Sequence, residues 1–247
     1  MTRPLLLLLC WLLMSSGVWA GASRSFDGAN DRLTVTAGDG SVFDSDTSLF
    51  SIIAWINTTG TSQTIYGANA DSSDVNADQW KFRLTSGGLA QFFFSAGPSN
   101  SNANAVSTTT VNDGTWYCIV GVRSATKTGV IYVNGIQEAS STYTGVNTAI
   151  GITANVFFGE QNAGTEDYSG GIAYATYHNS SIPSGLIFDA CILPEQSFGT
   201  NQMLLPLWGS DSPELDLTGN GRTATVTSGT TESFNGPPVM FGDGLPL

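Results

Sequence analysis

Residues 50–56 read Phe-Ser-Ile-Ile-Ala-Trp-Ile, a stretch that is apolar on both faces a β-strand would present. Successive side chains of a strand point to opposite faces, so this stretch predicts a central strand that is covered on both sides. Residues 80–84 read Trp-Lys-Phe-Arg-Leu instead, with Lys81 and Arg83 alternating with three apolar side chains. This alternation predicts a strand with one face in the core and the other face wet.

Similar short β-rich runs recur along the chain, separated by polar turns, and no long stretch repeats apolar residues at helical spacing. Asn134-Gly135 is the strongest hairpin signal, because both residues tolerate positive φ. One weak helical turn is expected at residues 184–190. We expect strands at residues 32–36, 49–57, 64–67, 80–85, 90–95, 105–110, 116–123, 129–134, 155–159, 171–178, 203–208 and 224–227. Such spacing predicts an all-β fold, a two-sheet antiparallel jelly-roll sandwich.

The first 20 residues have the pattern of a cleavable secretory signal. Arg3 precedes an apolar run at residues 5–14, and Val18 and Ala20 are small residues of the kind that a signal peptidase accepts. The apolar run is too short for a good membrane span, although a membrane anchor is the alternative. We therefore expect cleavage after Ala20 and a secreted chain, extracellular or at a cell surface, without membrane insertion.

The remaining residues have the length of one large sandwich. We expect a single jelly-roll domain at residues 21–232 and an extended C-terminal tail at residues 233–247. The chain carries 8 Lys and Arg against 20 Asp and Glu, a formal net charge of -12. Such a surface repels phosphate backbones, so nucleic acid is excluded as an expected partner.

Two cysteines, Cys118 and Cys191, lie outside the expected signal segment. An exported chain would allow them to form a disulfide. Two buried thiols, which behave as small apolar residues, are an equal alternative. The sequence leaves this choice open, because pairing requires Cα atoms within about 7 Å of each other.

Several segments, taken in order, resemble the laminin-G-like, concanavalin A-like jelly roll of lectins, pentraxins and some polysaccharide-cleaving enzymes. They are residues 25–33 (SFDGANDRL), 50–56, 113–120 (DGTWYCIV) with 130–135 (VIYVNG), and 168–179, which begins YSGGI. The string DLTGNG at residues 216–221 also resembles the family, and its late position implies a permuted or returning edge strand. The resemblance implies the sandwich fold and a binding function.

Pentraxin-like members of this superfamily hold calcium with a Glu-Gln-Asp string, and Glu160, Gln161 and Asn162 are similar to it. Asp78 is the residue from which a facing ligand is expected. Calcium prefers carboxylate and carbonyl oxygens, so the resemblance implies calcium as a cofactor held by these four residues. Two features weaken the match: Asn162 replaces a carboxylate, and Ala173 stands where the late strand commonly has Asp. The alternative is a solvated acidic loop.

Catalysis is not expected from this sequence. Retaining glycosidases need two carboxyl groups about 5–5.5 Å apart, and no strand carries the Glu-x-Asp-x-Glu pattern of jelly-roll enzymes. In a strand, Glu166 and Asp167 would point to opposite faces. His178 is the only histidine, and we expect a packed or half-exposed ring rather than a general base.

Acidic residues also gather at residues 71–78 and 27–31, where turn formation is the expected role. The tryptophans at positions 55, 80, 116 and 208 lie within strand patterns, so we expect them to pack in the core rather than to stack on sugars.

These observations favour a secreted glycan-binding or adhesive lectin-like module, assisted by calcium, that is not an enzyme. Its expected partners are extracellular polysaccharide or glycoconjugate, and copies of itself or other surface proteins. The second hypothesis is a structural or decorating component of an extracellular filament or virus particle. The third is a degenerate polysaccharide-active enzyme.

Overall fold

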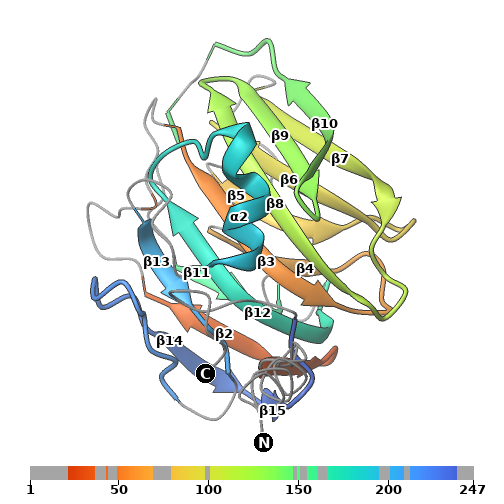
Figure 1. The fold of residues 1–247 in the computed structure, drawn as a ribbon, viewed down its shortest axis with the longest axis vertical. Helices are drawn as coiled ribbons and strands as arrows, with labels where there is room; N and C mark the ends of the chain where they lie inside the picture. Colours follow the sequence, from red (N-terminus) through yellow and green to blue (C-terminus); the bar gives the residue numbers. More distant parts are fainter. Residues whose placement is uncertain are drawn as a thin grey trace, which may run out of the picture.

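Two antiparallel β-sheets stack face to face in a sandwich (Figure 1). The computed structural model describes residues 22–36, 43, 49–68, 79–97, 101–146, 149–150, 155–160, 166–194, 201–208 and 212–237. Every pair between described strands is antiparallel. The predicted fold class, a two-sheet antiparallel sandwich, is confirmed.

The eight-stranded sheet has the order β10-β9-β8-β3-β12-β1-β15, and β13 pairs with β12 beside this path. Its strands are β1 (Ser23–Asp27), β3 (Ser51–Asn57), β8 (Trp116–Ala125), β9 (Thr128–Val133), β10 (Ile136–Thr142), β12 (Ser169–His178), β13 (Asn201–Leu205) and β15 (Thr231–Ser233). The stretch at residues 50–56 thus contributes a central strand, β3, which pairs with β8 on one side and β12 on the other. Its apolar pattern on both faces correctly predicted this place.

The seven-stranded sheet has the order β14-β2-β11-β4-β5-β6-β7. Its strands are β2 (Arg32–Val35), β4 (Thr64–Ala68), β5 (Gln79–Leu84), β6 (Leu89–Ser95), β7 (Asn102–Thr110), β11 (Val156–Phe158) and β14 (Ala224–Ser228). The edge strands of the two sheets meet where Glu138 of β10 accepts hydrogen bonds from the backbone N–H groups of Thr108 and Thr109 on β7, at 2.7 and 2.9 Å.

Aromatic rings fill the space between the two sheets. Phe50 and Tyr177 stack with their ring centroids 5.7 Å apart, and Trp80 stacks on Tyr177 at 5.4 Å. Within the seven-stranded sheet, Tyr66 stacks on Phe158 at 4.9 Å, and Phe50, beside the eight-stranded sheet, meets Phe92 of β6 edge-to-face at 6.0 Å. Pairs of this kind add about 0.5–1.5 kcal/mol each beyond the burial of their apolar area. The core therefore fixes both sheets through ring contacts that cross between them.

A second apolar cluster lies on the outer face of the eight-stranded sheet. The 3-10 helix η1 (Ser184–Leu186) and the helix α2 (Ile187–Ile192) cross this face, which is turned toward the viewer in Figure 1. Ile187, Ala190 and Cys191 of α2 are buried against the outward side chains of β3 and β8. The expected helical turn at residues 184–190 is confirmed, and it serves as a cover for one sheet.

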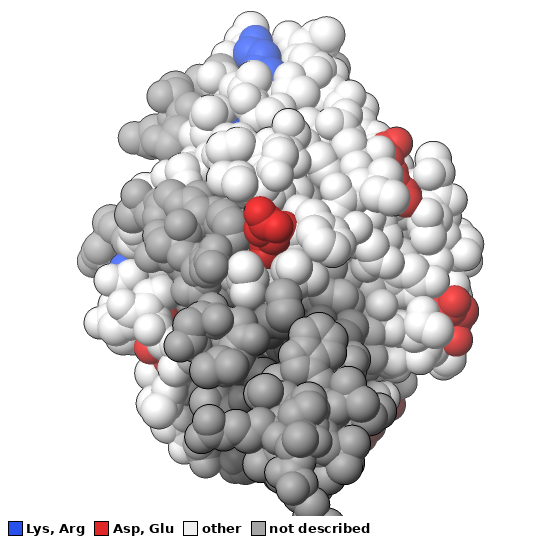
Figure 2. Space-filling model, in the orientation of Figure 1, with Lys and Arg blue, Asp and Glu red and all other residues white. Residues whose placement is uncertain are grey.

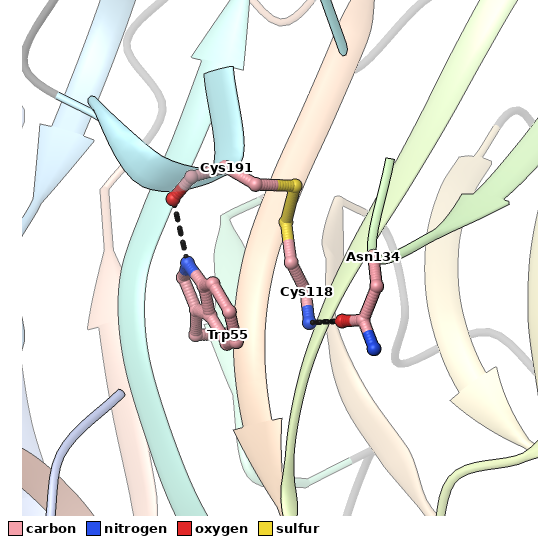
Figure 3. Close-up of a disulfide and its surroundings, with 4 residues drawn as sticks. All are labelled: Trp55, Cys118, Asn134 and Cys191. Atoms are coloured by element: carbon pink, nitrogen blue, oxygen red, sulfur yellow. Dashed lines mark hydrogen bonds between the residues drawn. A yellow bond between two sulfur atoms is a disulfide. The ribbon is translucent and has the colours of Figure 1, made fainter. Parts of the chain in front are cut away.

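A disulfide fastens this cover to the sheet. Cys118 of β8 and Cys191 of α2 are bonded, with their Cα atoms 5.9 Å apart (Figure 3). Trp55 Nε1 donates a hydrogen bond to the Cys191 carbonyl at 2.8 Å, and the Cys118 N–H donates to Asn134 Oδ1 at 2.9 Å. Of the two alternatives left open by the sequence, the structure shows the disulfide.

The β9–β10 hairpin turns at Asn134-Gly135, as predicted. Both residues have positive φ, at 50° and 84°. Such values favour Asn and Gly, and they match the right-handed twist of the two strands.

The C-terminal segment returns to both sheets. β14 forms the edge of the seven-stranded sheet beside β2, and β15 forms the edge of the other sheet beside β1. Ser23 Oγ also donates a hydrogen bond to the Asn235 carbonyl at 2.7 Å. A returning edge strand was implied for this segment by its resemblance, and β14 and β15 provide it.

Candidate functional site

The outer face of the seven-stranded sheet, which points away from the core, combines aromatic and polar side chains. Trp80 and Phe82 of β5 and Phe92 and Phe94 of β6 point into the core. Because side chains alternate along a strand, their neighbours point to the opposite side of the sheet. We call this side the outer face; on β5 and β6 it carries Gln79, Lys81, Arg83, Gln91, Phe93 and Ser95.

One row of directly opposed residues crosses six strands of this face. The register pairs Thr34 with Phe157, Phe157 with Gly67, Gly67 with Lys81, Lys81 with Phe93 and Phe93 with Asn104. Neighbouring strands lie about 4.8 Å apart, so the row spans about 24 Å. We call this set the outer row; it consists of Thr34, Phe157, Gly67, Lys81, Phe93 and Asn104.

Gly67 lets β5 pack closely against β4 in the outer row. A Cβ atom on Gly67 would lie 2.5 Å from the Lys81 Cβ and 2.5 Å from the Trp80 carbonyl oxygen. These separations are far below van der Waals contact, so only glycine fits without a shift of β5. The place that a side chain at position 67 would take is therefore filled by the Lys81 residue of the neighbouring strand.

Two cations lie over the two rings of the outer row. The Arg32 guanidinium carbon is 5.2 Å from the centroid of the Phe157 ring, and Lys81 Nζ is 5.7 Å from the centroid of the Phe93 ring. Both separations lie within the range in which a cation is attracted to a ring face. The rings are therefore held in defined positions by charged neighbours.

A chain of polar contacts runs beside the outer row. Arg83 Nη1 lies 3.8 Å from Glu166 Oε1, and Arg83 Nε donates a hydrogen bond to Gln91 Oε1. Gln91 Nε2 in turn donates to Asn104 Oδ1. Glu166 Oε2 accepts a further hydrogen bond from Thr64 Oγ1 at 2.9 Å. These contacts orient planar amide and guanidinium groups along the face.

Lys81 corrects one expectation from the sequence. Its strand face was predicted to be wet, but Lys81 is only 5% exposed, whereas Arg83 on the same face is partly exposed. Burial and the positive charge of Arg83 lower the pKa of Lys81 to about 8, against a smaller opposing effect of Glu166. The alternation correctly predicted the face of Lys81 but not the depth at which it lies.

Of the four residues predicted to hold calcium, the structure describes Glu160; Asp78, Gln161 and Asn162 lie outside the described residues. Glu160 follows β11 and is 7% exposed, with its Oε2 3.6 Å from Arg32 Nη1. Within the described residues, no three His, Cys, Asp or Glu side chains form a group that could hold a metal ion. The four-residue calcium site stays a prediction.

Asp167, which precedes β12, lies in the electrostatic field of Glu160. Burial, then the negative charges of Glu160 and Asp27, raise the pKa of Asp167. Its Oδ1 is buried and has no hydrogen-bond partner. An orphaned carboxylate oxygen beside a second carboxylate is chemistry that fits calcium. Gln79, the neighbour of Asp78 in the chain, begins β5 at the opposite end of the sheet from Glu160, as the registers of β4 with β5 and β11 show.

The acidic residues at 27–31 stabilise a turn, as expected. Asp31 Oδ2 accepts a hydrogen bond from the Asp27 N–H at 2.8 Å, and Asp27 Oδ1 accepts one from the Ala29 N–H at 2.8 Å. The other proposed cluster, at residues 71–78, lies outside the described residues.

His178 is packed inside the molecule at the end of β12. The ring is fully buried, and its Nε2 lies 3.1 Å from Thr176 Oγ1. Burial lowers the pKa of His178 to about 4. The predicted packed ring is confirmed.

The four tryptophans expected in the core differ in their environments. Trp55 and Trp80 are buried, at 6% and 0% exposure. Trp116 is only partly buried, and Trp208 is 39% exposed, because β13 ends at Leu205 before reaching it. The prediction of core packing was therefore wrong for Trp208, whose Nε1 donates to Tyr174 OH at 3.3 Å.

The sequence is matched over residues 27–184 by the family model of the concanavalin A-like lectin/glucanases superfamily. The chain therefore belongs to this superfamily. Its members and structural neighbours are mostly binding modules, although some enzymes share the fold. No curated protein matches the sequence.

Solved structures of the concanavalin A-like superfamily resemble the chain in fold. A candidate carbohydrate binding protein from Bacteroides ovatus is 17% identical, with a TM-score of 0.67 over 89% of this chain and 61% of its own. The heptameric SAP-like pentraxin from Limulus polyphemus is 12% identical, with a TM-score of 0.57 over 89% of this chain and 97% of its own. Domains LG4-5 of mouse laminin alpha1 are 17% identical, with a TM-score of 0.52 over 67% of this chain and 44% of theirs. The chain thus spans only part of the first and third of these proteins.

Most residues of the outer face were not recognised as candidates from the sequence. The relevant signal is the alternation in β6, where Gln91, Phe93 and Ser95 occupy every second position. All three side chains are buried, so what marks this face is an apolar ring among buried polar side chains, which packing in an apolar core does not require.

Proposed function

We propose that this protein is an exported saccharide-binding module that holds an extracellular polysaccharide or glycoconjugate on the outer face of its seven-stranded sheet. The observation that carries the proposal is the outer row, in which Phe157 and Phe93 flank Gly67 and Lys81 in direct register. The neighbouring protein from Bacteroides ovatus, whose name describes candidate carbohydrate binding, supports it.

The chemistry of the outer face suits a sugar. The apolar C–H face of a pyranose packs on an aromatic ring, and its hydroxyl groups pair with planar polar side chains. Phe157 is partly exposed and Asn104 is exposed, so both are available to a ligand at the surface. The hydrogen bonds from Arg83 to Gln91 and from Gln91 to Asn104 hold these groups in place before a ligand arrives. Such ordering lowers the entropy lost on binding.

The proposal of export has three supports. The Cys118–Cys191 disulfide is a bond that forms and persists in oxidising compartments. Laminin G-like domains are typically extracellular, and residues 1–20 have the pattern of a secretory signal. Within the described part of the chain, no helix is long and apolar enough to cross a membrane.

Calcium is part of the proposal. Glu160 and Asp167, together with Gln161 and Asn162, would hold the ion; the orphaned Oδ1 of Asp167 supports the first two. When bound, calcium would tie the segment after β11 to the start of β12. Differential scanning calorimetry tests this: calcium should raise the melting temperature of the wild-type protein, and much less that of Asp167→Asn.

A structural or adhesive role is the second candidate function. Ile136, Leu186 and Phe188, at the β9–β10 turn and the η1–α2 segment, are 69%, 40% and 56% exposed. The described part of this face carries few charged side chains (Figure 2). A surface with few charges and with exposed apolar residues suits contact with another copy or another surface protein. Analytical ultracentrifugation of Phe188→Ser against the wild-type protein tests this candidate.

A glycan array tests the proposed function, with and without a chelator. Phe157→Ala should weaken binding about tenfold, because it removes the ring on which a sugar stacks. Phe234→Ala is the matched control, since Phe234 is 82% exposed and follows β15, away from the outer face. Equal binding by both variants, or no binding by the wild-type protein, contradicts the proposal. A reducing-end assay on the bound polysaccharides should show no sustained release of sugar.

A further inference from the structure

Two segments of the chain match the acceptor sequence for N-linked glycosylation, which is Asn-X-Ser or Asn-X-Thr with X other than Pro. They are residues 57–59 (Asn-Thr-Thr) and residues 179–181 (Asn-Ser-Ser). An N-linked glycan is bulky and polar, so a folded protein tolerates it only where the asparagine side chain reaches solvent. The place of each asparagine in the fold therefore decides which of the two segments is a glycosylation site.

Asn179 lies on the surface of the protein, directly after β12. The strand ends at His178, and the chain bends at Asn179 and Ser180 before it continues to η1. Asn179 is exposed, and Ser181, whose hydroxyl group completes the acceptor sequence, is partly exposed. A glycan on the amide nitrogen of Asn179 would therefore extend into solvent.

The backbone of this segment is held by a buried serine. Ser51 Oγ donates a hydrogen bond to the Ser180 carbonyl at 2.9 Å, and the Ile182 N–H donates to Ser51 Oγ at 2.9 Å. Ser51 is fully buried in β3. These two bonds fix the chain on both sides of Ser181 without using the Asn179 amide, so a glycan on Asn179 leaves them intact.

Asn57, in contrast, takes part in the packing at the end of β3. It is partly buried, and its Nδ2 donates a hydrogen bond to the Gly114 carbonyl at 2.6 Å. The Gly114 N–H donates in return to the Thr58 carbonyl at 2.9 Å, and Thr58 is 2% exposed. A sugar on Asn57 Nδ2 would have to enter the contact between this segment and the turn at Gly114. The folded protein therefore disfavours a glycan at Asn57.

The segment at Asn179 is separate from the face proposed to bind a saccharide. β12 belongs to the eight-stranded sheet, whereas the outer row lies on the seven-stranded sheet, in the other layer of the sandwich (Figure 1). The outer row points away from the core, and hence away from the layer that contains β12. A glycan at Asn179 is therefore compatible with a ligand on the outer row.

We propose that Asn179 carries an N-linked oligosaccharide, and that Asn57 does not, when the chain is exported through a eukaryotic secretory pathway. The inference rests on the export in the proposed function, and it adds a modification site. The oligosaccharide is transferred from a lipid diphosphate. The bond between the anomeric carbon of the sugar and the diphosphate oxygen breaks, and a bond from that carbon to Asn179 Nδ2 forms. The amide nitrogen loses one proton and the lipid diphosphate leaves, so the transfer needs no oxidant or reductant.

Expression in cultured mammalian cells tests the inference, because these cells supply the transferring enzyme and the lipid-linked oligosaccharide. Two forms of the chain would be compared: one with its own residues 1–20, and one with the signal peptide of an unrelated secreted protein in their place. Protein from the medium is digested with peptide-N-glycosidase, which removes the glycan and converts its asparagine to aspartate. Mass spectrometry of the peptides then identifies each converted position.

The wild-type protein should carry one glycan, at Asn179. Ser181→Ala should lose this glycan, because it removes the acceptor hydroxyl and keeps Asn179, whereas Ser181→Thr keeps the acceptor sequence and should keep the glycan. Thr59→Ala is the matched control, since it removes the other acceptor sequence and should leave the glycosylation of the protein unchanged. Thermal unfolding of each secreted variant checks that it is folded.

Three results would count against these proposals in different ways. An unmodified Asn179 in protein that reaches the medium, or a glycan at Asn57, overturns the inference. Retention of both forms inside the cells without a glycan at Asn179 overturns it as well. Export by the unrelated signal peptide but not by residues 1–20 contradicts the proposed export, and the peptides of the exported form then decide the glycosylation of Asn179.

Discussion

Arg24 and Glu214 form an ion pair inside the protein, with Arg24 Nη2 2.6 Å from Glu214 Oε1 and side-chain exposures of 2% and 6%. Arg24 Nε donates to the same oxygen at 3.1 Å, and Arg24 Nη1 donates to Thr230 Oγ1 at 2.8 Å. Arg24 belongs to β1, and both partners belong to the C-terminal segment. The Arg24 side chain of β1 therefore holds the C-terminal segment, which supplies an edge strand to each sheet.

Glu214→Ala should destabilise the protein strongly, because it leaves the Arg24 guanidinium buried without its carboxylate. Breaking a buried pair in this way costs about 3–5 kcal/mol. Urea denaturation followed by circular dichroism measures the free energy of unfolding. The double variant Arg24→Met/Glu214→Leu is the control. Its free energy of unfolding should fall less than that of Glu214→Ala, since neither charge of the pair remains buried. A loss below about 1 kcal/mol in Glu214→Ala would show that the pair does not hold the closing segment.

Cys118→Ser/Cys191→Ser should lower the free energy of unfolding by about 4 kcal/mol, since the disulfide joins residues 73 positions apart and restricts the unfolded chain. Trp55 fluorescence should also change, because the Cys191 carbonyl accepts the hydrogen bond from its indole N–H. An unchanged unfolding midpoint would mean that α2 is held on the sheet by its apolar contacts alone.

The protein should lose stability in mild acid because of His178. Its folded pKa of about 4 lies below the ordinary value of 6.5, so the unfolded chain binds the proton first as the pH falls. Between pH 7 and pH 5 the loss from this residue is about 2 kcal/mol. His178→Gln should remove that part of the pH dependence; parallel stability curves for the two proteins would contradict the assignment.

Lys81→Met should stabilise the protein at pH 7, by about 2 kcal/mol after allowance for solvent screening. The folded pKa of Lys81, about 8, is below its ordinary value of 10.5, so the wild-type protein gains stability as the pH rises from 8 to 10.5. The advantage of the variant should therefore shrink over that window. Urea denaturation at pH 7 and pH 10 checks this, with Lys127→Met as control. A destabilised variant at pH 7 would contradict the account of Lys81 as a buried charge that costs stability.

The sequence predicted most of this fold because its strands carry local signals. The apolar stretch of β3 and the alternation of β5 each indicated a strand and its covered faces. By contrast, β10 reads Ile-Gln-Glu-Ala-Ser-Ser-Thr and has no apolar alternation, so only its pairing with β9 makes it a strand. β15 has three residues, too few to show an alternation of apolar and polar side chains. It forms a strand because it pairs with β1.

The candidate face was harder to predict, because it depends on register between strands. Phe157, Gly67, Lys81 and Phe93 come from four strands, and nothing in the local sequence shows that they lie opposite one another. The burial of a side chain also depends on residues far away in the sequence. The alternation placed Lys81 on the outer face, but only the folded sheet shows that it is buried. The calcium residues were chosen by resemblance. The folded chain instead brings Asp167 into the field of Glu160, where the Tyr168 N–H donates to the Gly159 carbonyl at 2.7 Å.

Chemical-shift mapping by nuclear magnetic resonance tests the central claim most directly. The 15N-labelled protein would be titrated with the saccharide that binds it most tightly on the array, and its backbone amide shifts recorded. The account predicts the largest changes at Phe157, Gly67, Lys81 and Phe93, which form a continuous row. Changes confined to the opposite face, at Gly135 and Phe188 near α2, with the outer row unaffected, would contradict it.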